Sequence, residues 1–256
     1  MSFRFKKSLG QNFLRDLNTL ERISKELNIK EDDNILEIGP GDGAITQFLL
    51  KAKNITVVEK DSSLVKILEK KFSSYDNLKI IEGDFLEQDL KSFAKIKVIG
   101  SIPYYITGPI IKKLIEESEA EELFLIIQKE VAKRLVAIPS TKDYGILTLL
   151  VKYYGEVSLL FNISKNSFYP VPNVESSMIK ITLNKPGKYN IEEEKFNKCV
   201  KLLFGARRKT ILNNLSNILD KAKSLELLNK IGIDPNLRAE DLDIEKIIKI
   251  AEVFFE

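Results

Sequence analysis

Short apolar runs alternate along the chain with stretches in which apolar residues recur every three or four positions. Runs such as 34–38 and 96–100 are typical of strands buried on both faces, whereas the spacing within 16–28 predicts a helix capped by Asp16. Strands that alternate with helices indicate a mostly parallel sheet. The pattern predicts strands at 34–38, 55–59, 78–82, 96–100, 122–127, 156–163 and 177–183, and helices at 16–28, 44–52, 62–72, 109–117, 129–136 and 144–154.

A breaker segment at 184–188 ends this pattern, and every periodic stretch beyond it predicts helix. The last two strands flank the segment 167–173 and are expected to pair as an antiparallel edge. We therefore predict an α/β domain over residues 1–185 and a small all-α C-terminal domain over residues 186–256. The C-terminal helices are expected at 192–204, 209–219, 225–231 and 244–255.

Composition narrows the class of protein and its chemistry. The longest apolar stretches fall short of the ~18 to 20 residues that a bilayer requires, and the N-terminus has no signal-peptide pattern, so we expect a cytoplasmic protein without a membrane contact. The single cysteine cannot form an internal disulfide. Without any histidine the chain has neither a histidine-ligated zinc site nor an imidazole base, which excludes most hydrolase mechanisms, and we expect no metal.

Basic residues gather in two segments although the net charge is only +3. Residues 1–15 carry four basic and no acidic side chains, and residues 196–232 carry eight basic and two acidic ones. These segments account for +4 and +6, which leaves −7 for the rest of the chain. Such a distribution indicates a partner with a phosphate backbone, although solvated helix faces would give the same runs.

A glycine-rich turn, Gly39-x-Gly41-x-Gly43, follows the strand predicted at 34–38. Glycines there let the backbone approach a ligand closely, although a tight strand-to-helix connection would also use them. Glu59 ends the next strand and is able to accept hydrogen bonds from ribose hydroxyls, and Asp84 with Phe85 follows the strand after that. Three polar strand ends in succession predict a nucleoside site at the carboxyl edge of the sheet.

The tetrapeptide Ser101-Ile102-Pro103-Tyr104 follows the strand predicted at 96–100. It presents a polar acceptor, a rigid proline and an aromatic face, which suits methyl transfer to a flat exocyclic amine. The lone pair of such an amine is delocalised into the ring until hydrogen-bond acceptors draw on its protons. The Ser101 side chain and the Ile102 carbonyl supply such acceptors, and in-line transfer then needs alignment rather than a strong base.

Together these motifs resemble those of the class I S-adenosylmethionine-dependent methyltransferases, which have a Rossmann-like, seven-stranded sheet. More narrowly, the chain resembles the ribosomal RNA adenine dimethylases from about Phe5 to Phe254. The segments that carry this narrower resemblance are Lys6-Lys-Ser-Leu-Gly-Gln-Asn-Phe-Leu14, Gln128-Lys-Glu-Val-Ala-Lys-Arg134, Phe168-Tyr-Pro-Val-Pro-Asn-Val-Glu-Ser176 and Phe204-Gly-Ala-Arg-Arg-Lys-Thr-Ile-Leu-Asn-Asn-Leu215.

The resemblance implies N6,N6-dimethylation of two adjacent adenosines in the 3′-terminal hairpin of small-subunit rRNA, by a monomer that acts on immature 30S-type subunits. Two alternatives stay open: a large-subunit rRNA methyltransferase of the macrolide-resistance type, and a non-catalytic ribosome-assembly factor. The proline-rich and arginine-rich segments favour the small-subunit branch, and an intact nucleoside site counts against a pure binding protein.

The resemblance also implies a role for each candidate residue. The cofactor, S-adenosylmethionine, would contact Asn12, Leu14, Gly39, Gly41, Glu59, Asp84, Phe85 and Ser101, and the acceptor base would contact Ser101, Ile102, Pro103, Tyr104 and Phe168. RNA phosphates are expected at Arg4, Lys6, Lys7, Arg207, Arg208 and Lys209. The family usually has asparagine at the position of Ser101, so this serine bears on the rate and degree of methylation.

Overall fold

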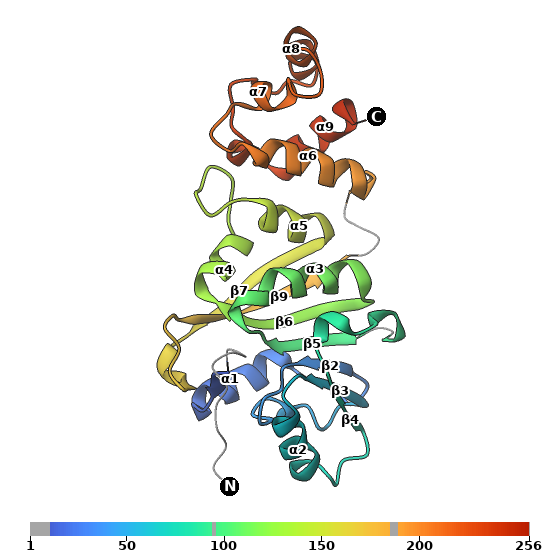
Figure 1. Ribbon diagram of the computed structural model, residues 1–256, viewed down its shortest axis with the longest axis vertical. Coiled ribbons are helices and arrows are strands. Elements are labelled where there is room, and N and C mark those ends of the chain that lie inside the picture. Colours follow the sequence, from blue (N-terminus) through green and yellow to red (C-terminus); the bar gives the residue numbers. More distant parts are fainter. Residues whose placement is uncertain (1–10, 94–95, 185–188, 256) are drawn as a thin grey trace. The chain divides into compact units, whose positions relative to one another are not determined.

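A computed structural model describes residues 11–93, 96–184 and 189–255, which form two compact units (Figure 1). The first unit comprises Met1–Ala132 and Glu156–Leu183, and the second comprises Lys133–Gly155 and Asn184–Glu256. The chain passes between the units close to the boundary predicted at residue 185. However, residues 133–155, which the sequence places in the first domain, belong to the helical unit because Tyr153 stacks on Phe196 with 4.4 Å between ring centroids.

The first unit is built on a seven-stranded sheet in the order β4-β3-β2-β5-β6-β9-β7. Adjacent strands from β4 to β6 pair in parallel, and β6 pairs antiparallel with β9, which confirms the predicted mixed sheet with an antiparallel edge. The strands are β2 (Asn34–Ile38), β3 (Asn54–Glu59), β4 (Leu78–Glu82), β5 (Ile96–Ser101), β6 (Ala120–Gln128), β7 (Gly155–Ile163) and β9 (Ser176–Leu183).

Helices cover this sheet, as its near-continuous apolar strands require. The helices are α1 (Leu17–Leu27), α2 (Ser62–Lys71) and α3 (Thr107–Glu117), with α4 (Lys129–Leu135) following β6. Asp16 caps α1 by accepting from the Thr19 N–H, as predicted. One cluster of buried residues joins α1 residues such as Ile23 to strand residues such as Ile55, Val57 and Ile126. Figure 1 shows α3 beside β6.

The helix predicted at 44–52 is wrong. This segment forms turns around one short 3-10 helix, Thr46–Phe48, with hydrogen bonds from Phe48 N to Ile45 O and from Leu49 N to Thr46 O, both 2.9 Å. The buried Thr46 hydroxyl donates to the Glu37 carboxylate at 2.6 Å. We infer that this tertiary bond and the burial of the segment outweigh its helical periodicity.

A small two-stranded sheet was also missed. It pairs β1 (Phe13–Leu14) antiparallel with β8 (Phe168–Tyr169), in the register Phe13↔Tyr169 and Leu14↔Phe168. Arg15 N extends the pairing by donating to Ser167 O at 2.8 Å. Two-residue strands lie below what periodicity can detect, yet this pair joins distant segments beside the site described below.

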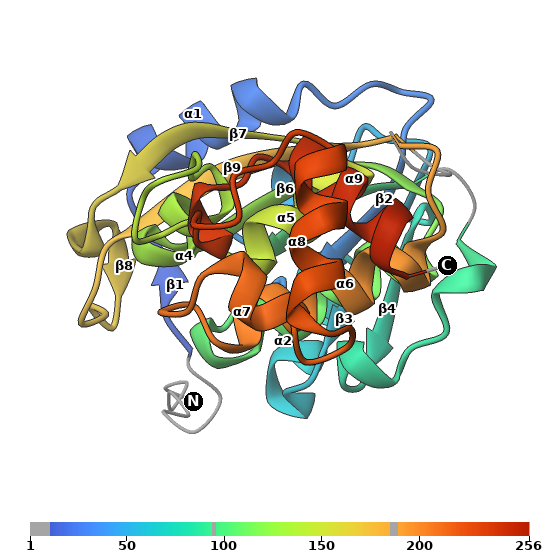
Figure 2. The ribbon, with the colours of Figure 1, turned by 90° about the horizontal axis from the view of Figure 1, so that it is seen from above.

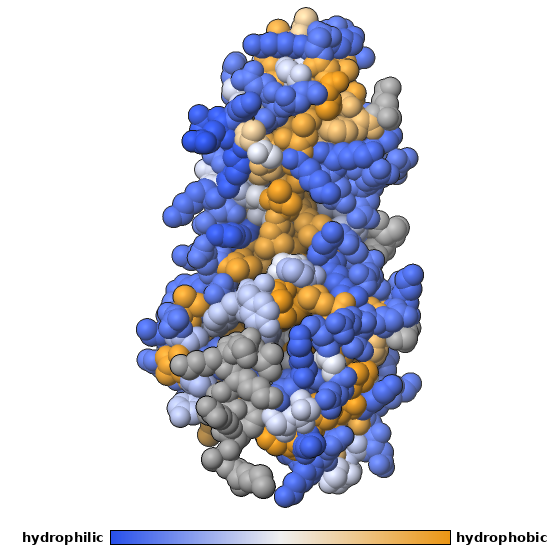
Figure 3. Space-filling view, in the orientation of Figure 1, coloured by the Kyte–Doolittle hydropathy of each residue, from blue (hydrophilic) through white to orange (hydrophobic). Residues whose placement is uncertain are grey.

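The second unit is helical, as predicted, with α5 (Ile146–Tyr154), α6 (Glu193–Gly205), α7 (Ile211–Leu215), α8 (Lys221–Lys230) and α9 (Ile244–Phe254) (Figure 2). The helix predicted at 209–219 is shorter, because Thr210 caps α7 and the backbone turns after Leu215. Figure 3 shows hydrophobic side chains reaching the surface between hydrophilic ones near α7 and α8, where Ile218 is exposed. No helix among the described residues is long and apolar enough to cross a bilayer.

Candidate active site

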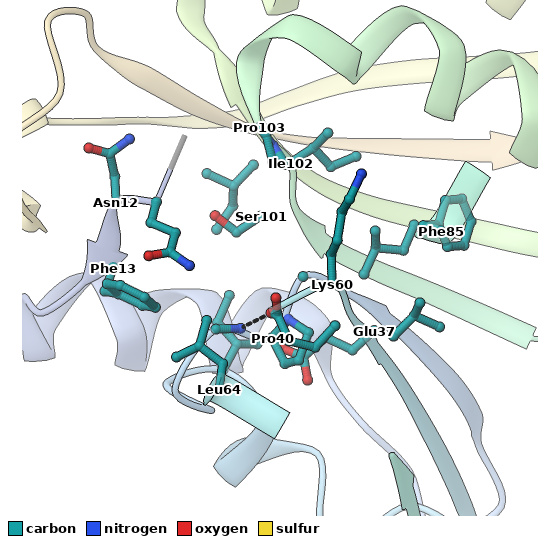
Figure 4. Close-up of a pocket in the computed structure, with 18 of the residues that line it drawn as sticks. Asn12, Phe13, Glu37, Pro40, Lys60, Leu64, Phe85, Ser101, Ile102 and Pro103 are labelled. Carbon is teal, nitrogen blue, oxygen red and sulfur yellow. Dashed lines mark hydrogen bonds between the residues drawn. The ribbon is translucent and has the colours of Figure 1, made fainter. Parts of the chain in front are cut away.

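One cavity of about 180 Å³ lies at the carboxyl ends of the parallel strands (Figure 4). All residues predicted from the sequence to contact cofactor or acceptor base line this cavity, although they come from segments as distant as 12–14 and 168. They are Asn12, Leu14, Gly39, Gly41, Glu59, Asp84, Phe85, Ser101, Ile102, Pro103, Tyr104 and Phe168. The structure therefore brings the full predicted set together, while the role of each residue stays a prediction.

The glycine turn passes so close to its neighbours that side chains would not fit. Gly39, Gly41 and Gly43 have positive φ angles of 64°, 61° and 79°. A Cβ atom on Gly41 would lie 2.7 Å from the Phe13 ring, and one on Gly43 would lie 2.5 Å from the Phe72 ring. Because L residues with side chains rarely adopt these angles, and because no space is left for a Cβ atom at Gly41 and Gly43, the turn depends on glycine.

Glu59 is fixed at the floor of the cavity by two backbone N–H groups. Gly41 N donates to one carboxylate oxygen at 3.1 Å, and Asp61 N donates to the other at 2.9 Å. Burial raises the pKa of Glu59, and these two N–H groups oppose the rise. Since a carboxylate has about four lone-pair sites, acceptor capacity remains for ribose hydroxyls.

Glu37 lies beneath the same turn and was not predicted as a site residue. It is 2% exposed, and Thr46 is the donor to its carboxylate. Burial raises the pKa of Glu37 to about 7. The sequence did show an acidic residue at the start of the glycine turn, but nothing in it indicated that this residue is buried.

Asp84 sits at the rim of the cavity with both carboxylate oxygens engaged. One oxygen accepts from Leu86 N at 2.9 Å, and the other forms an ion pair with Lys60 Nζ at 2.7 Å. The Lys60 hydrogen bond lowers the pKa of Asp84. Lys60 also lines the cavity but was missed, because a lysine after a strand-end acid has no distinctive pattern.

The acceptor end of the cavity is formed by uncharged groups. Ser101 ends β5, and Figure 4 shows it between Ile102 on one side and Asn12 with Phe13 on the other. Ile102 N donates to Ile126 O at 3.0 Å, which fixes the chain after the strand. Within the described residues, no hydrogen bond reaches the Ile102 carbonyl oxygen, which leaves it able to accept from a ligand.

The β1–β8 pair closes this end by placing Phe168 beside Leu14, and Phe168 is 4% exposed. Other residues of the lining were not predicted, and Gln11 and Ser176 are two of them. Gln11 donates to Asp61 at 2.7 Å, and the hydroxyls of Ser176 and Tyr104 lie 3.0 Å apart. Among the described residues, no group of histidine, cysteine or carboxylate side chains is suited to a metal ion.

Of the predicted RNA-binding residues, the structure describes Arg207, Arg208 and Lys209, and none of these three lines the cavity. Arg4, Lys6 and Lys7 lie outside the described residues. Arg208 and Lys209 are exposed in the turn after α6. Arg207 instead forms an ion pair with Glu240 at 2.6 Å and donates to Tyr144 O at 3.0 Å, so a phosphate would compete with bonds inside the second unit.

A comparison of the chain with models of protein families identifies the family to which it belongs. The family model described as ribosomal RNA adenine dimethylase matches residues 2–256. The chain belongs to this family. The resemblance seen in the sequence motifs is thereby confirmed over the whole chain.

Relatives and solved structures of similar proteins agree with this family. "Ribosomal RNA small subunit methyltransferase A" of Fusobacterium nucleatum is 45% identical over 262 residues, with 99% of each chain covered. Its namesake of Clostridioides difficile is 38% identical and covers 98% of this chain and 91% of its own. A dimethyladenosine transferase from Plasmodium falciparum has a TM-score of 0.84 at 26% identity, covering 93% of this chain and 95% of its own.

The large-subunit branch is represented among the solved structures as well. The 23S rRNA methyltransferase ErmE has a TM-score of 0.76 at 25% identity, covering 96% of this chain and 100% of its own. The dimethyladenosine transferase matches the fold of this chain more closely than ErmE does. Both share the Rossmann-like methyltransferase fold that the sequence predicted.

Proposed function

We propose that this protein transfers methyl groups from S-adenosylmethionine to the N6 atoms of adenosines in small-subunit rRNA, with N6,N6-dimethyladenosine as the product. The observation that carries this proposal is the single cavity in which a carboxylate-lined nucleoside site adjoins Ser101-Ile102-Pro103-Tyr104. The 45% identical relative, named for small-subunit rRNA, supports the choice of substrate.

The cavity fits the cofactor by the shape and chemistry of its own residues. Gly39 and Gly41 border the cavity with backbone atoms alone, and the Phe13 ring already occupies the place of a Cβ atom on Gly41, so no side chain of the turn separates a ligand from this backbone. Glu59 would accept from the ribose hydroxyls, and Asp84 would accept from the amino group of the adenine while Phe85 packs against the ring. Asn12 and Leu14 would cover the methionine end. When bound, S-adenosylmethionine supplies an electrophilic methyl group.

The acceptor end would prepare the target amine. The Ile102 carbonyl and the Ser101 hydroxyl would accept hydrogen bonds from the N6 protons, which localises the lone pair on nitrogen. Tyr104 and Phe168 would hold the adenine ring between them, a contribution of about 1 to 3 kcal/mol per stacked base. Because the buried backbone at Ile102 and the Pro103 ring fix the direction of the acceptors, the amine is aligned without a general base.

The exact target within the rRNA and the oligomeric state are suggested by the family resemblance and form part of this proposal. We expect the target to be two adjacent adenosines of the 3′-terminal hairpin within an immature 30S-type subunit, and the protein to act as a monomer. Cytoplasmic location, expected from the sequence, follows from this substrate and stays a prediction.

Arg208 and Lys209 are candidate phosphate contacts in the second unit, because both are exposed and, among the described residues, neither pairs with an acid as Arg207 does. The Arg208→Glu change is expected to weaken binding to small subunits and to lower the salt dependence of that binding by about one phosphate contact. Lys25→Glu, at the exposed end of α1, is the matched control and should leave both unchanged. If Arg208→Glu binds small subunits with the affinity and the salt dependence of the wild type, Arg208 does not contact RNA.

The function itself is tested with subunits that lack the modification. Purified protein, labelled S-adenosylmethionine and separated small and large subunits from a deletion strain are combined, and methylated adenosines are mapped. The proposal predicts dimethyladenosine in small-subunit rRNA only; labelling of large subunits would support the macrolide-resistance branch.

A second arm of the same assay compares the wild type with Ser101→Asn, whose amide oxygen reaches further and accepts more strongly. We expect the wild type to be active and the variant to raise the ratio of dimethyl to monomethyl product by about threefold. Methyl incorporation by Ser101→Asn alone would show that Ser101 does not support catalysis.

A further inference from the structure

The hydroxyl groups of Tyr104 and Ser176 meet at the acceptor end of the cavity, with 3.0 Å between their oxygen atoms. Both side chains line the cavity. Tyr104 opens the 3-10 turn after β5, whereas Ser176 opens β9, 72 residues further along the chain. Their contact is therefore a product of the fold, and no local motif indicated it.

Ser176 provides a fixed point for this contact. Its side chain is 1% exposed, and its backbone is held in antiparallel register with Gln128. The preceding residue is also held, because Lys129 N donates to Glu175 O at 3.0 Å. Among the described residues, Tyr104 is the hydrogen-bond partner of the Ser176 hydroxyl.

Tyr104, by contrast, is half-buried, and its backbone carbonyl accepts a hydrogen bond from Thr107 Oγ1 at 3.4 Å. Ile106 N donates to Pro103 O at 3.2 Å within the same turn. Rotation about the first side-chain torsion would still move the whole ring, whereas rotation about the second turns the ring about an axis that passes through its hydroxyl oxygen. A hydrogen bond to that oxygen therefore restricts the first torsion and fixes where the far end of the ring lies. An aromatic platform that shifts by about 1 Å can cost a large part of the alignment on which transfer depends.

We propose that Ser176 is a positioning residue, whose hydrogen bond to Tyr104 fixes the position of the ring against which the target adenine stacks. The inference rests on the proposed function and adds a residue to it. A monomethylated amine has one proton fewer for the acceptors and a methyl group to accommodate, so it has fewer productive poses. The second methyl transfer therefore depends more on the position of the ring than the first.

The neighbouring Ser177 offers a matched control. Successive residues of a strand point to opposite faces of the sheet, and Ser177 donates to Asn162 Oδ1 at 2.8 Å instead of lining the cavity. It is as buried as Ser176, and its partner Asn162 is exposed. Ser177→Ala therefore removes a serine hydrogen bond from the same strand without affecting Tyr104.

The test compares Ser176→Ala, Tyr104→Phe, the double variant and Ser177→Ala on unmethylated small subunits. The measurements are kcat, the KM for S-adenosylmethionine, the ratio of monomethyl to dimethyl product and the thermal unfolding midpoint. We expect Ser176→Ala to lower kcat for the second transfer by about threefold to tenfold, with an unchanged cofactor KM. Tyr104→Phe should match it, and the double variant should add nothing, since all three lack the same bond.

Three results would overturn the inference: a wild-type product ratio for Ser176→Ala, additive effects in the double variant, or an equal loss in Ser177→Ala. If Ser176→Ala fails to fold, Tyr104→Phe still removes the Tyr104–Ser176 hydrogen bond, because Tyr104 is only half-buried. The product ratio of Tyr104→Phe then tests the inference without Ser176→Ala. A wild-type protein that methylates no small-subunit adenosine would instead contradict the proposed function.

Discussion

The two ends of the cavity are built from different kinds of interaction. At the cofactor end, charged groups are held by backbone and ion pairs: Glu59 by two N–H groups, Glu37 by a buried hydroxyl, and Asp84 by Lys60. At the acceptor end the groups are uncharged, and a single hydroxyl contact joins Tyr104 to Ser176. The difference suggests a rigid site for one unchanging cofactor beside a site that admits both an amine and its methylated product.

The largest effect is expected where the cofactor end is most rigid. Gly41→Ala places a Cβ atom 2.7 Å from the Phe13 ring in a backbone conformation that alanine disfavours. We expect it to weaken S-adenosylhomocysteine binding at least about a hundredfold, as measured by calorimetry. Gly108→Ala on α3 is the control, since nothing lies within 4 Å of its added Cβ and it should bind normally. Wild-type affinity of Gly41→Ala for S-adenosylhomocysteine would show that the cofactor end does not depend on glycine at this position.

The next effect concerns pH and the buried acid at the cofactor end. Because burial raises the pKa of Glu37 from 4.5 to about 7, the folded protein holds this proton to a higher pH than the unfolded chain does. Its contribution to stability is therefore present below about pH 4.5 and is lost as pH rises through about 7, on the order of 3 kcal/mol in total.

Glu37→Gln should flatten this pH dependence, because glutamine keeps an acceptor for Thr46 and does not ionise. Urea unfolding of the cofactor-free protein at about pH 5 and about pH 8 measures the change in unfolding free energy. The same fall in stability for variant and wild type would show that another group is responsible.

A smaller effect is expected at the rim, where water screens the interaction. Lys60→Met removes the ion pair to Asp84, and since the Lys60 side chain is 56% exposed, we expect the cofactor KM to rise by only about threefold to fivefold. The kcat at saturating cofactor should not change. Lys66→Met, an exposed lysine on α2, should behave as wild type. A fall in kcat with an unchanged KM would assign Lys60 to the acceptor end.

The sequence predicted the cavity well because parallel strands end at one edge of a sheet. Gly39, Glu59, Asp84 and Ser101 each follow a strand, so adjacency along the sheet brings them together. The resemblance added Asn12, Leu14 and Phe168, whose proximity depends on a strand pair too short for periodicity to show.

What the sequence missed depends on tertiary contacts. Thr46 was placed on a helix that does not form, so its bond to the buried Glu37 was not foreseen. Ser176 and Lys60 acquire their roles from partners on other strand ends. Residues 133–155 continue the alternation of helices and strands seen in the first unit, yet they belong to the second unit. The spacing of apolar residues predicts a helix there but does not indicate which unit the helix packs in.

The claim that the cofactor end and the acceptor end of the cavity act separately is tested most directly with a Tyr104→Ala variant. S-adenosylhomocysteine is titrated into this variant, and methyl transfer is measured on the same preparation. Truncating the ring removes the stacking platform at the acceptor end and leaves Glu59 and its two N–H donors in place. We predict an affinity for S-adenosylhomocysteine within about twofold of the wild type and a rate of methyl transfer at least about tenfold lower. Cofactor affinity that falls as far as transfer does would contradict it.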